Sequence, residues 1–90
     1  MYEIDYKPKR VCPSNIHVGV SDDGETIERV EFTGGCKGNT KAVAKLVRGH
    51  KVDEIVELLE GNTCGARPTS CADQLTIALR QAREGARAIA

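Results

Sequence analysis

Residues 16–33 read IHVGVSDDGETIERVEFT, and this stretch decides the fold of the chain. In its first five residues, apolar Ile16, Val18 and Val20 alternate with His17 and Gly19, as in a strand with one buried face. The Asp-Gly pair at positions 23–24 is a strong turn signal. A second strand is expected over about residues 26–33. The stretch therefore predicts an antiparallel β-hairpin.

The register of this hairpin follows from the position of its turn. With the turn centred near Gly24, Val18 lies opposite Val30 and Ile16 lies opposite Phe32. Both apolar pairs then share one face, as burial of that face requires.

Two helices are predicted directly after the hairpin. The first covers about residues 40–48, and Asn39 is its expected N-cap. The second is expected to begin with Asp53 as its N-cap and to end at Gly61. Its apolar positions follow helical spacing and are Val52, Ile55, Val56 and Leu59.

A third helix is predicted after a loop over residues 62–69. Ser70 and Asp73 have the spacing of a capping box, so Cys71 is expected at the first helical position. The helix is expected to fray beyond Gly85.

The order of these elements predicts the fold class. Residues 1–8 are expected to be an extended entry segment or a short edge strand. Strands followed by helices are typical of an α+β domain, here an N-terminal antiparallel sheet packed against three C-terminal helices in two layers. Residues 1–90 are expected to form a single domain, and its core is expected to be thin because so short a chain buries little of its surface. The chain has only three aromatic residues, so this core has few large side chains. Such a core favours an additional stabilising element.

Charge and hydropathy exclude some functions. Thirteen basic and thirteen acidic residues give a net charge of zero, which argues against nucleic-acid or membrane-surface binding by bulk charge. No apolar run approaches the roughly 20 residues of a membrane-spanning helix. No signal peptide is visible, so we expect a cytoplasmic protein whose thiols stay reduced.

The cysteines Cys12, Cys36, Cys64 and Cys71 are the main candidates for function. The hairpin register, extended outward, places Cys12 opposite Cys36, and a bulge would shift this pairing by one residue. Cys36 precedes one predicted helix and Cys71 begins another, where the positive end of the helix favours the thiolate. Cys64 lies on a glycine-flanked loop that leads back to Cys71.

Four thiolates from two parts of the chain predict a tetrahedral metal site. Zinc is the expected occupant and an iron–sulfur cluster is the alternative. The competing structural interpretation is that the cysteines are small buried apolar residues. A rival functional interpretation is a thiol redox protein in which Cys64 and Cys71 form a dithiol, although no C-x-x-C pair is present.

A third interpretation is a regulatory module that binds a nucleotide or a reductase subunit through the glycine-rich residues 34–40. A tight strand-to-helix turn is the simpler explanation of the same glycines.

Histidine and arginine positions give weaker signals. His17 is expected to be exposed on the polar face of its strand, and His50 is expected to interact with the end of a helix rather than to bind a metal. Arg80, Arg83 and Arg87 form a stripe on the last helix, which indicates a solvated face or a surface for an acidic partner.

Residues 64–75, CGARPTSCADQL, and residues 33–39, TGGCKGN, resemble the signature of the TSCPD domain family. The resemblance extends from Cys12 to the last helix. Ala72 stands where the family name has proline, an exchange that an early helix position tolerates.

The TSCPD family occurs as small stand-alone proteins and as a C-terminal region of adenosylcobalamin-dependent ribonucleotide reductases. The resemblance implies an accessory metal-binding module, or alternatively a thiol/disulfide redox or regulatory partner of such a reductase. This chain is far too short for the catalytic barrel of that enzyme, so we expect no nucleotide reduction by the chain alone. The resemblance leaves other enzymatic activity open.

The chain is also remotely similar to iron–sulfur scaffold proteins of the IscU and NifU type, which share its order of hairpin, Gly-Cys turn and helices. By this similarity Cys12, Cys36 and Cys71 match the three scaffold cysteines. Ser14 replaces the scaffold's aspartate, and Cys64 is the candidate fourth ligand. The similarity therefore implies an IscU-like domain with a closed site, more structural than a scaffold that releases its cluster.

Overall fold

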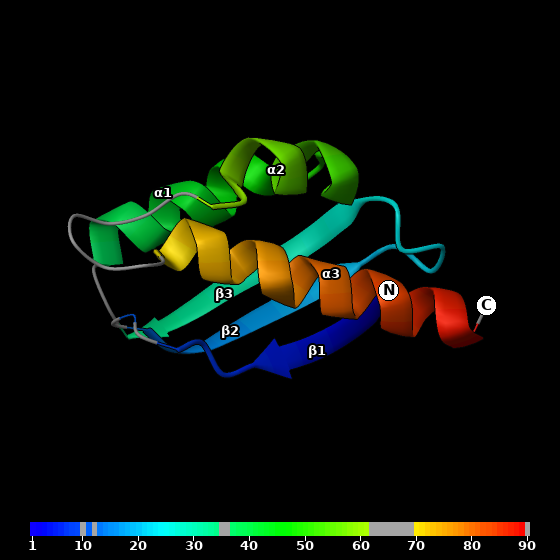
Figure 1. Ribbon diagram of the computed structural model, residues 1–90, viewed down its shortest axis with the longest axis horizontal. Helices are drawn as coiled ribbons and strands as arrows, with labels where there is room; N and C mark the ends of the chain where they lie inside the picture. The colour runs from blue at the N-terminus through cyan, green and yellow to red at the C-terminus, as the bar shows by residue number, and fades with distance from the viewer. Residues whose placement is uncertain (10, 12, 35–36, 62–69, 90) are drawn as a thin grey trace.

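The computed structural model describes residues 1–9, 11, 13–34, 37–61 and 70–89 of the chain. One antiparallel sheet has the order β1-β2-β3 (Figure 1). Its strands are β1 (Tyr2–Tyr6), β2 (Pro13–Val20) and β3 (Ile27–Gly34). The helices that follow are α1 (Lys37–Val47), α2 (Val52–Leu59) and α3 (Cys71–Ile89). The predicted α+β class, with strands before helices, is confirmed.

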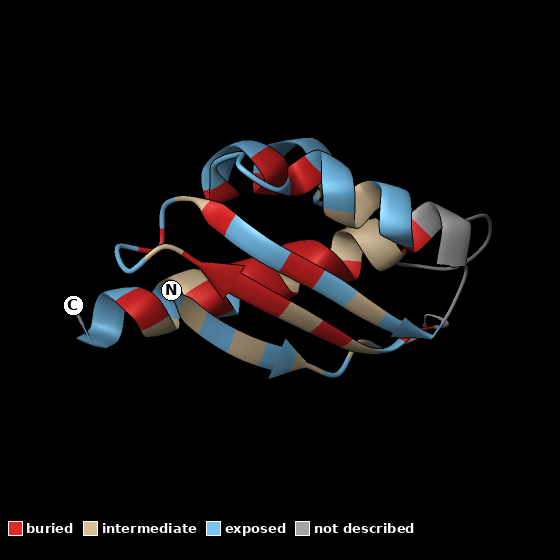
Figure 2. Cartoon of the chain, turned by 180° about the vertical axis from the view of Figure 1, so that it is seen from behind, coloured by how far each residue is buried: buried red, intermediate tan, exposed pale blue. Residues whose placement is uncertain are grey.

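The helices cover one face of the sheet. Helix α3 packs on β1 and β2, α1 packs on β3, and α2 packs on α3 (Figure 1). Seen from behind, the other face of the sheet is open and carries most of its exposed positions (Figure 2). Among the residues whose burial is described, the hydrophobic core cluster consists of Ile16, Val18, Val20, Ile27, Val30, Val47, Val52, Ile55, Val56, Leu75, Ala78, Leu79, Ala82 and Ala86. As the composition predicts, this core is made of small and medium aliphatic side chains.

The hairpin register is confirmed at its centre. Val18 pairs with Val30, and Ile16 pairs with Phe32. The predicted edge strand is also confirmed, because β1 pairs with β2 in antiparallel register. Alternation and turn position were therefore sufficient to predict the pairing of the sheet's apolar face.

The register shifts by one residue near the outer end of the hairpin. The irregularity lies between Pro13 and Asn15, and Pro13 lies opposite Gly34. A bulge of this kind inserts an extra residue in one strand. The predicted pairing of Cys12 with Cys36 lies outside the described residues.

The turn between β2 and β3 is fixed by local hydrogen bonds. Gly24 has a φ of +76° and donates its N–H to the Ser21 carbonyl at 2.7 Å. The Asp23 carboxylate accepts hydrogen bonds from the Ser21 hydroxyl and the Glu25 N–H, and these bonds lower the pKa of Asp23. A Cβ atom at Gly24 would lie 3.0 Å from the Arg83 carbonyl oxygen, so the turn also packs closely on α3.

Helix α1 begins earlier than predicted. Its first residue is Lys37, so Asn39 lies within the first turn and is not the N-cap. Gly38 is tolerated there because the first-turn N–H groups lack helical partners in any case, and glycine costs most in a helix interior.

Helix α2 begins at Val52, and its N-cap is Lys51 rather than Asp53. The Val52 N–H donates to the Glu25 carbonyl at 2.9 Å, so the approach to the helix is held by the β2–β3 turn. Contact with this turn therefore decides where α2 begins, and Asp53 is placed in the first turn of the helix, where a carboxylate is favourable.

Helix α3 continues to Ile89 without fraying beyond Gly85. Ala86 is fully buried, and a Cβ atom at Gly85 would overlap the Tyr2 ring. Close packing of the last turns against β1 therefore extends the helix past the glycine.

The arginine stripe of α3 contacts the chain itself. Arg80 forms an ion pair with Glu60, and Arg83 forms one with Asp53 at the start of α2. The Arg87 Nε donates to a backbone carbonyl of the β2–β3 turn at 3.4 Å. The stripe is therefore a partly exposed face, as the sequence predicts, and α2 and the turn supply oxygen partners along it.

Candidate functional site

The predicted site consists of four cysteines, and the first turn of α3 is the part of it that the structure describes. The starts of β2, α1 and α3 and the end of β3 all lie at the left end of the molecule in Figure 1. Cys71 is the first residue of α3 and is partly exposed. Its thiol therefore lies at the positive end of a 19-residue helix, which favours a thiolate and so suits both metal ligation and redox chemistry.

Ser70 caps this helix, as predicted. Its hydroxyl oxygen accepts a hydrogen bond from the Asp73 N–H at 3.1 Å, and the side chain is buried. The bond satisfies one of the N–H groups that have no partner within the helix. The cap thereby fixes the backbone on both sides of Cys71.

The Asp73 carboxylate connects two helices. Its Oδ1 accepts a hydrogen bond from the Gly61 N–H at 2.7 Å, just after the end of α2. Gly61 has a φ of +81°, a left-handed conformation that glycine adopts without strain. Asp73 therefore fixes the chain immediately before residues 62–69, in addition to its predicted place in the capping motif.

Gln74 is a site residue that the sequence analysis did not identify. Its side chain is buried, and its Oε1 accepts hydrogen bonds from the Tyr6 hydroxyl at 2.9 Å and the Lys9 N–H at 3.0 Å. Burial raises the pKa of Tyr6, and the charge of Asp73 raises it further. Its burial could have been predicted from the sequence, because Gln74 lies four residues before Ala78 and so falls on the apolar stripe of the helix.

The cysteines are only partly within the described structure. Cys71 is described, whereas Cys12, Cys36 and Cys64 lie outside the described residues. Within the described residues, no group of three or more histidine, cysteine, aspartate or glutamate side chains is placed to hold a metal ion.

A polar cluster on the open face of the sheet is distinct from this site. The His17 Nε2 lies 3.0 Å from Glu3 Oε1, its Nδ1 lies 2.9 Å from Asp5 Oδ1, and Asn15 also donates to Asp5. The bonds to Glu3 and Asp5 raise the pKa of His17, and the bond to His17 lowers the pKa of Glu3. The bonds from Asn15 and His17 lower the pKa of Asp5. His17 is therefore half-buried rather than freely exposed, because β1 places two carboxylates beside it.

His50 also has a carboxylate partner. Its Nδ1 lies 2.6 Å from Glu54 Oε1 on α2. Its N–H donates to the Val47 carbonyl at 3.1 Å, as expected of a residue at the end of α1.

The described helices give no candidate membrane span, since none combines the necessary length with the necessary apolar character. No curated protein and no solved structure matches the chain significantly.

A family comparison covers almost the whole chain. The family described as TSCPD domain matches residues 2–83, from the first strand well into α3. The match includes Ser70, Cys71 and Asp73, which lie in the capped first turn described above. On this evidence the chain belongs to the TSCPD domain family.

Proposed function

We propose that this protein is a metal-binding module in which Cys12, Cys36, Cys64 and Cys71 bind one zinc ion. An iron–sulfur cluster is the alternative occupant. The module would serve a ribonucleotide reductase as an accessory domain rather than act as an enzyme by itself. The observation that supports it best is the set of hydrogen bonds from the first turn of α3 to chain segments that flank the other cysteines.

Two of these segments are bonded directly to α3. Lys9 lies three residues before Cys12, and its N–H is held by the side chain of Gln74. Gly61 lies three residues before Cys64, and its N–H is held by Asp73. Through these two contacts, the segments that lead to Cys12 and to Cys64 are bonded to the helix that begins with Cys71.

The hairpin brings a third segment, the end of β3 that leads to Cys36, to the same end of the molecule. Pro13 follows Cys12 directly, and it lies opposite Gly34, which precedes Cys36 by two residues. Each flank is therefore tied either to the first turn of α3 or to the neighbouring strand end. Segments ordered in this way lose less entropy when four thiolates close around a metal ion.

Tetrathiolate coordination suits zinc, which prefers four sulfur or nitrogen ligands in tetrahedral sites. Such a site would also stabilise a core that has few large aromatic side chains. The accessory role rests on the family, which the resemblance connects with the C-terminal region of ribonucleotide reductases.

Elemental analysis and absorption spectra of protein purified without chelator test the metal site. We expect one zinc per chain and no visible absorbance, whereas iron with charge-transfer bands would indicate the cluster instead. Cys71→Ser should lose most of the metal. Ser70→Ala is the matched control, because it should lower stability by about 1 kcal/mol while retaining the metal. Protein with no metal and four free thiols would contradict the proposal.

The partly exposed position of Cys71 at a helix start favours one second candidate, a redox dithiol with Cys64. Thiol counting over cycles of oxidant and reductant separates the two functions. A redox protein loses two thiols reversibly, whereas a zinc protein keeps its thiols protected until the metal is removed.

A further inference from the structure

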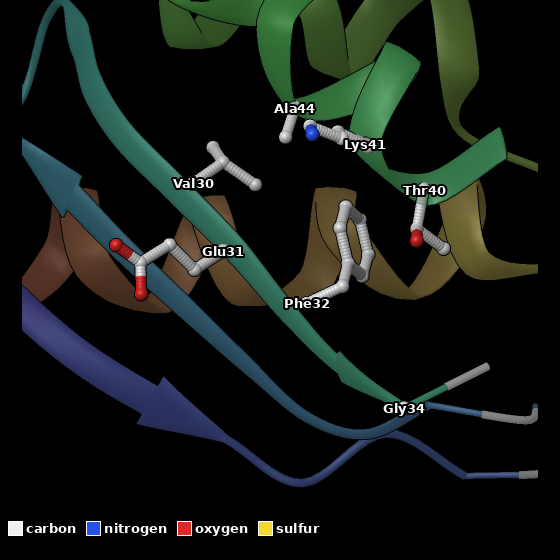
Figure 3. A pocket seen from close by; sticks show the side chains of 7 residues that line it. All are labelled: Val30, Glu31, Phe32, Gly34, Thr40, Lys41 and Ala44. Carbon is white, nitrogen blue, oxygen red and sulfur yellow. The ribbon is translucent and has the colours of Figure 1, made fainter. Parts of the chain in front are cut away.

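A groove follows the outer edge of β3, away from the cysteine flanks. Its larger part is a hollow of about 450 Å³ between β3 and α1, with Val30 and Phe32 on one side and Lys41 and Ala44 on the other. Figure 3 shows Val30 and Phe32 pointing toward α1, whereas Glu31 points away from it. A second hollow of about 160 Å³ shares Val30, Lys41 and Ala44 with the first, so the groove continues along α1.

The groove borders an open sheet edge. At the first residue of β3, this edge is occupied by the segment between α1 and α2. The Ile27 N–H donates to the His50 carbonyl at 2.9 Å, and the Gly49 N–H donates to the Ile27 carbonyl at 2.8 Å. Beyond Ile27, no strand in the described part of the chain pairs with this edge. An open edge presents unpaired backbone groups to which a further strand can bond.

The helix beside the groove presents basic side chains. Lys41 and Lys45 on α1 and Arg48 directly after its end are exposed and line the groove. None of the three forms an ion pair within the residues that the structure describes. Excess positive charge therefore gathers along the groove in a chain whose net charge is zero.

Two carboxylates also lie near the open edge and moderate this charge. Glu28 and Glu31 line an adjoining hollow of about 460 Å³ together with Arg29 and Arg48. Glu31 forms an ion pair with Arg29, whose Nη2 lies 2.7 Å from the Glu31 Oε1. Because Glu31 is already paired and Lys41, Lys45 and Arg48 have no ion pair within the described residues, these three cations remain available to an acidic ligand.

We propose that the open edge of β3 and the basic face of α1 bind an extended acidic segment of a partner protein as an additional strand. The backbone of the segment would pair with β3 beyond Ile27. Alternate side chains would face α1, with apolar ones against Phe32 and Ala44 and carboxylates near Lys41, Lys45 and Arg48.

Charge complementarity favours this occupant over a second copy of the chain. In a symmetric pairing of two β3 edges, each copy brings the same surface to the two-fold axis. The basic faces of both α1 helices would then flank one axis, and their like charges would oppose association. An acidic strand has no such penalty.

A peptide selection tests the proposal and does not require the partner protein to be identified first. Immobilised full-length protein is used to select from a random octapeptide library, and enriched peptides are synthesised and titrated into ¹⁵N-labelled protein. We expect enriched sequences in which the alternate positions that face α1 carry both carboxylates and apolar residues. The amide shifts should be confined to β3 and α1. N-methylation along the peptide should abolish binding at every second position only, because a strand pairs with its neighbour through alternate residues.

A pair of variants tests the basic face. The Lys41→Glu/Lys45→Glu double variant should weaken the selected peptide by about tenfold or more, because attraction becomes repulsion. Lys7→Glu is the control at the opposite edge of the sheet and should bind nearly as the parent does. Absence of enriched acidic peptides, a flat N-methylation profile, binding insensitive to the double variant, or a dimer closed through β3 would each overturn the proposal.

Discussion

The first turn of α3 and the remainder of the same helix are held by different interactions. From Leu75 onward, the helix buries aliphatic side chains such as Ala78 and Leu79 against the sheet and α2. At the start of the helix, Ser70, Asp73 and Gln74 make side-chain hydrogen bonds, three of them to residues far away in the chain.

The two parts of the helix therefore have different roles, one in stability and one in positioning other segments of the chain. Apolar burial is non-directional and supplies most of the stability of a small domain. Hydrogen bonds contribute less net free energy, but they require defined donors and acceptors at defined distances. The helix therefore stabilises the fold through its apolar stripe, and its first turn fixes where the segments that approach the cysteines enter the structure.

The apolar part of the helix can be tested with Leu79→Ala. Leu79 is fully buried, so truncation should lower the free energy of unfolding by about 2–5 kcal/mol. Urea denaturation followed by circular dichroism measures the change. The folded fraction should keep the metal content of the parent protein. A loss below about 1 kcal/mol would show that the stripe is not the main source of stability.

The polar first turn can be tested with Gln74→Leu. The Tyr6 hydroxyl and the Lys9 N–H would lose their common acceptor, which should cost about 1–3 kcal/mol. Amide exchange at Lys9 should accelerate more than exchange in the sheet. Thr76→Val is the control, since Thr76 is equally buried but its hydroxyl donates only to a carbonyl of its own helix. Equal effects of both variants on Lys9 exchange would contradict the anchoring role of Gln74.

The pH dependence of stability tests the partly exposed His17 cluster, for comparison with the buried contacts of Gln74. The raised pKa of His17 adds stability that is complete below its ordinary value of 6.5 and is lost as the pH rises through the raised pKa. The lowered pKa of Glu3 acts in the opposite direction, with stability present above 4.5 and lost as the pH falls. The cluster should therefore contribute most near pH 5.5.

Thermal unfolding at pH 5.5 and 8.5 measures this contribution. We expect a small decrease in melting temperature at the higher pH, below the effect of Gln74→Leu, because the cluster is partly exposed. His17→Gln should remove most of the decrease that the cluster causes. If the difference in melting temperature between the two pH values were the same in His17→Gln as in the parent protein, other groups would be responsible for it.

The sequence by itself determined the hairpin, its central register and the cap at Ser70. Each of these depends on residues close together in the chain, through the alternation of apolar side chains, an Asp-Gly turn and the spacing of a capping motif. Physical constraints over such short distances leave few alternatives, and Val18 accordingly pairs with Val30 as expected.

Only the tertiary structure decided the polar contacts between distant segments. Gln74 meets Lys9 across 65 positions, and Asp73 meets Gly61 across 12. The start of α2 at Val52 was likewise decided by a bond to the β2–β3 turn. Periodicity tells which side of a helix is buried, but it does not tell which backbone group will face a polar side chain there. That choice depends on how the sheet and the helices are packed together, and it fixes the flanks of the candidate site.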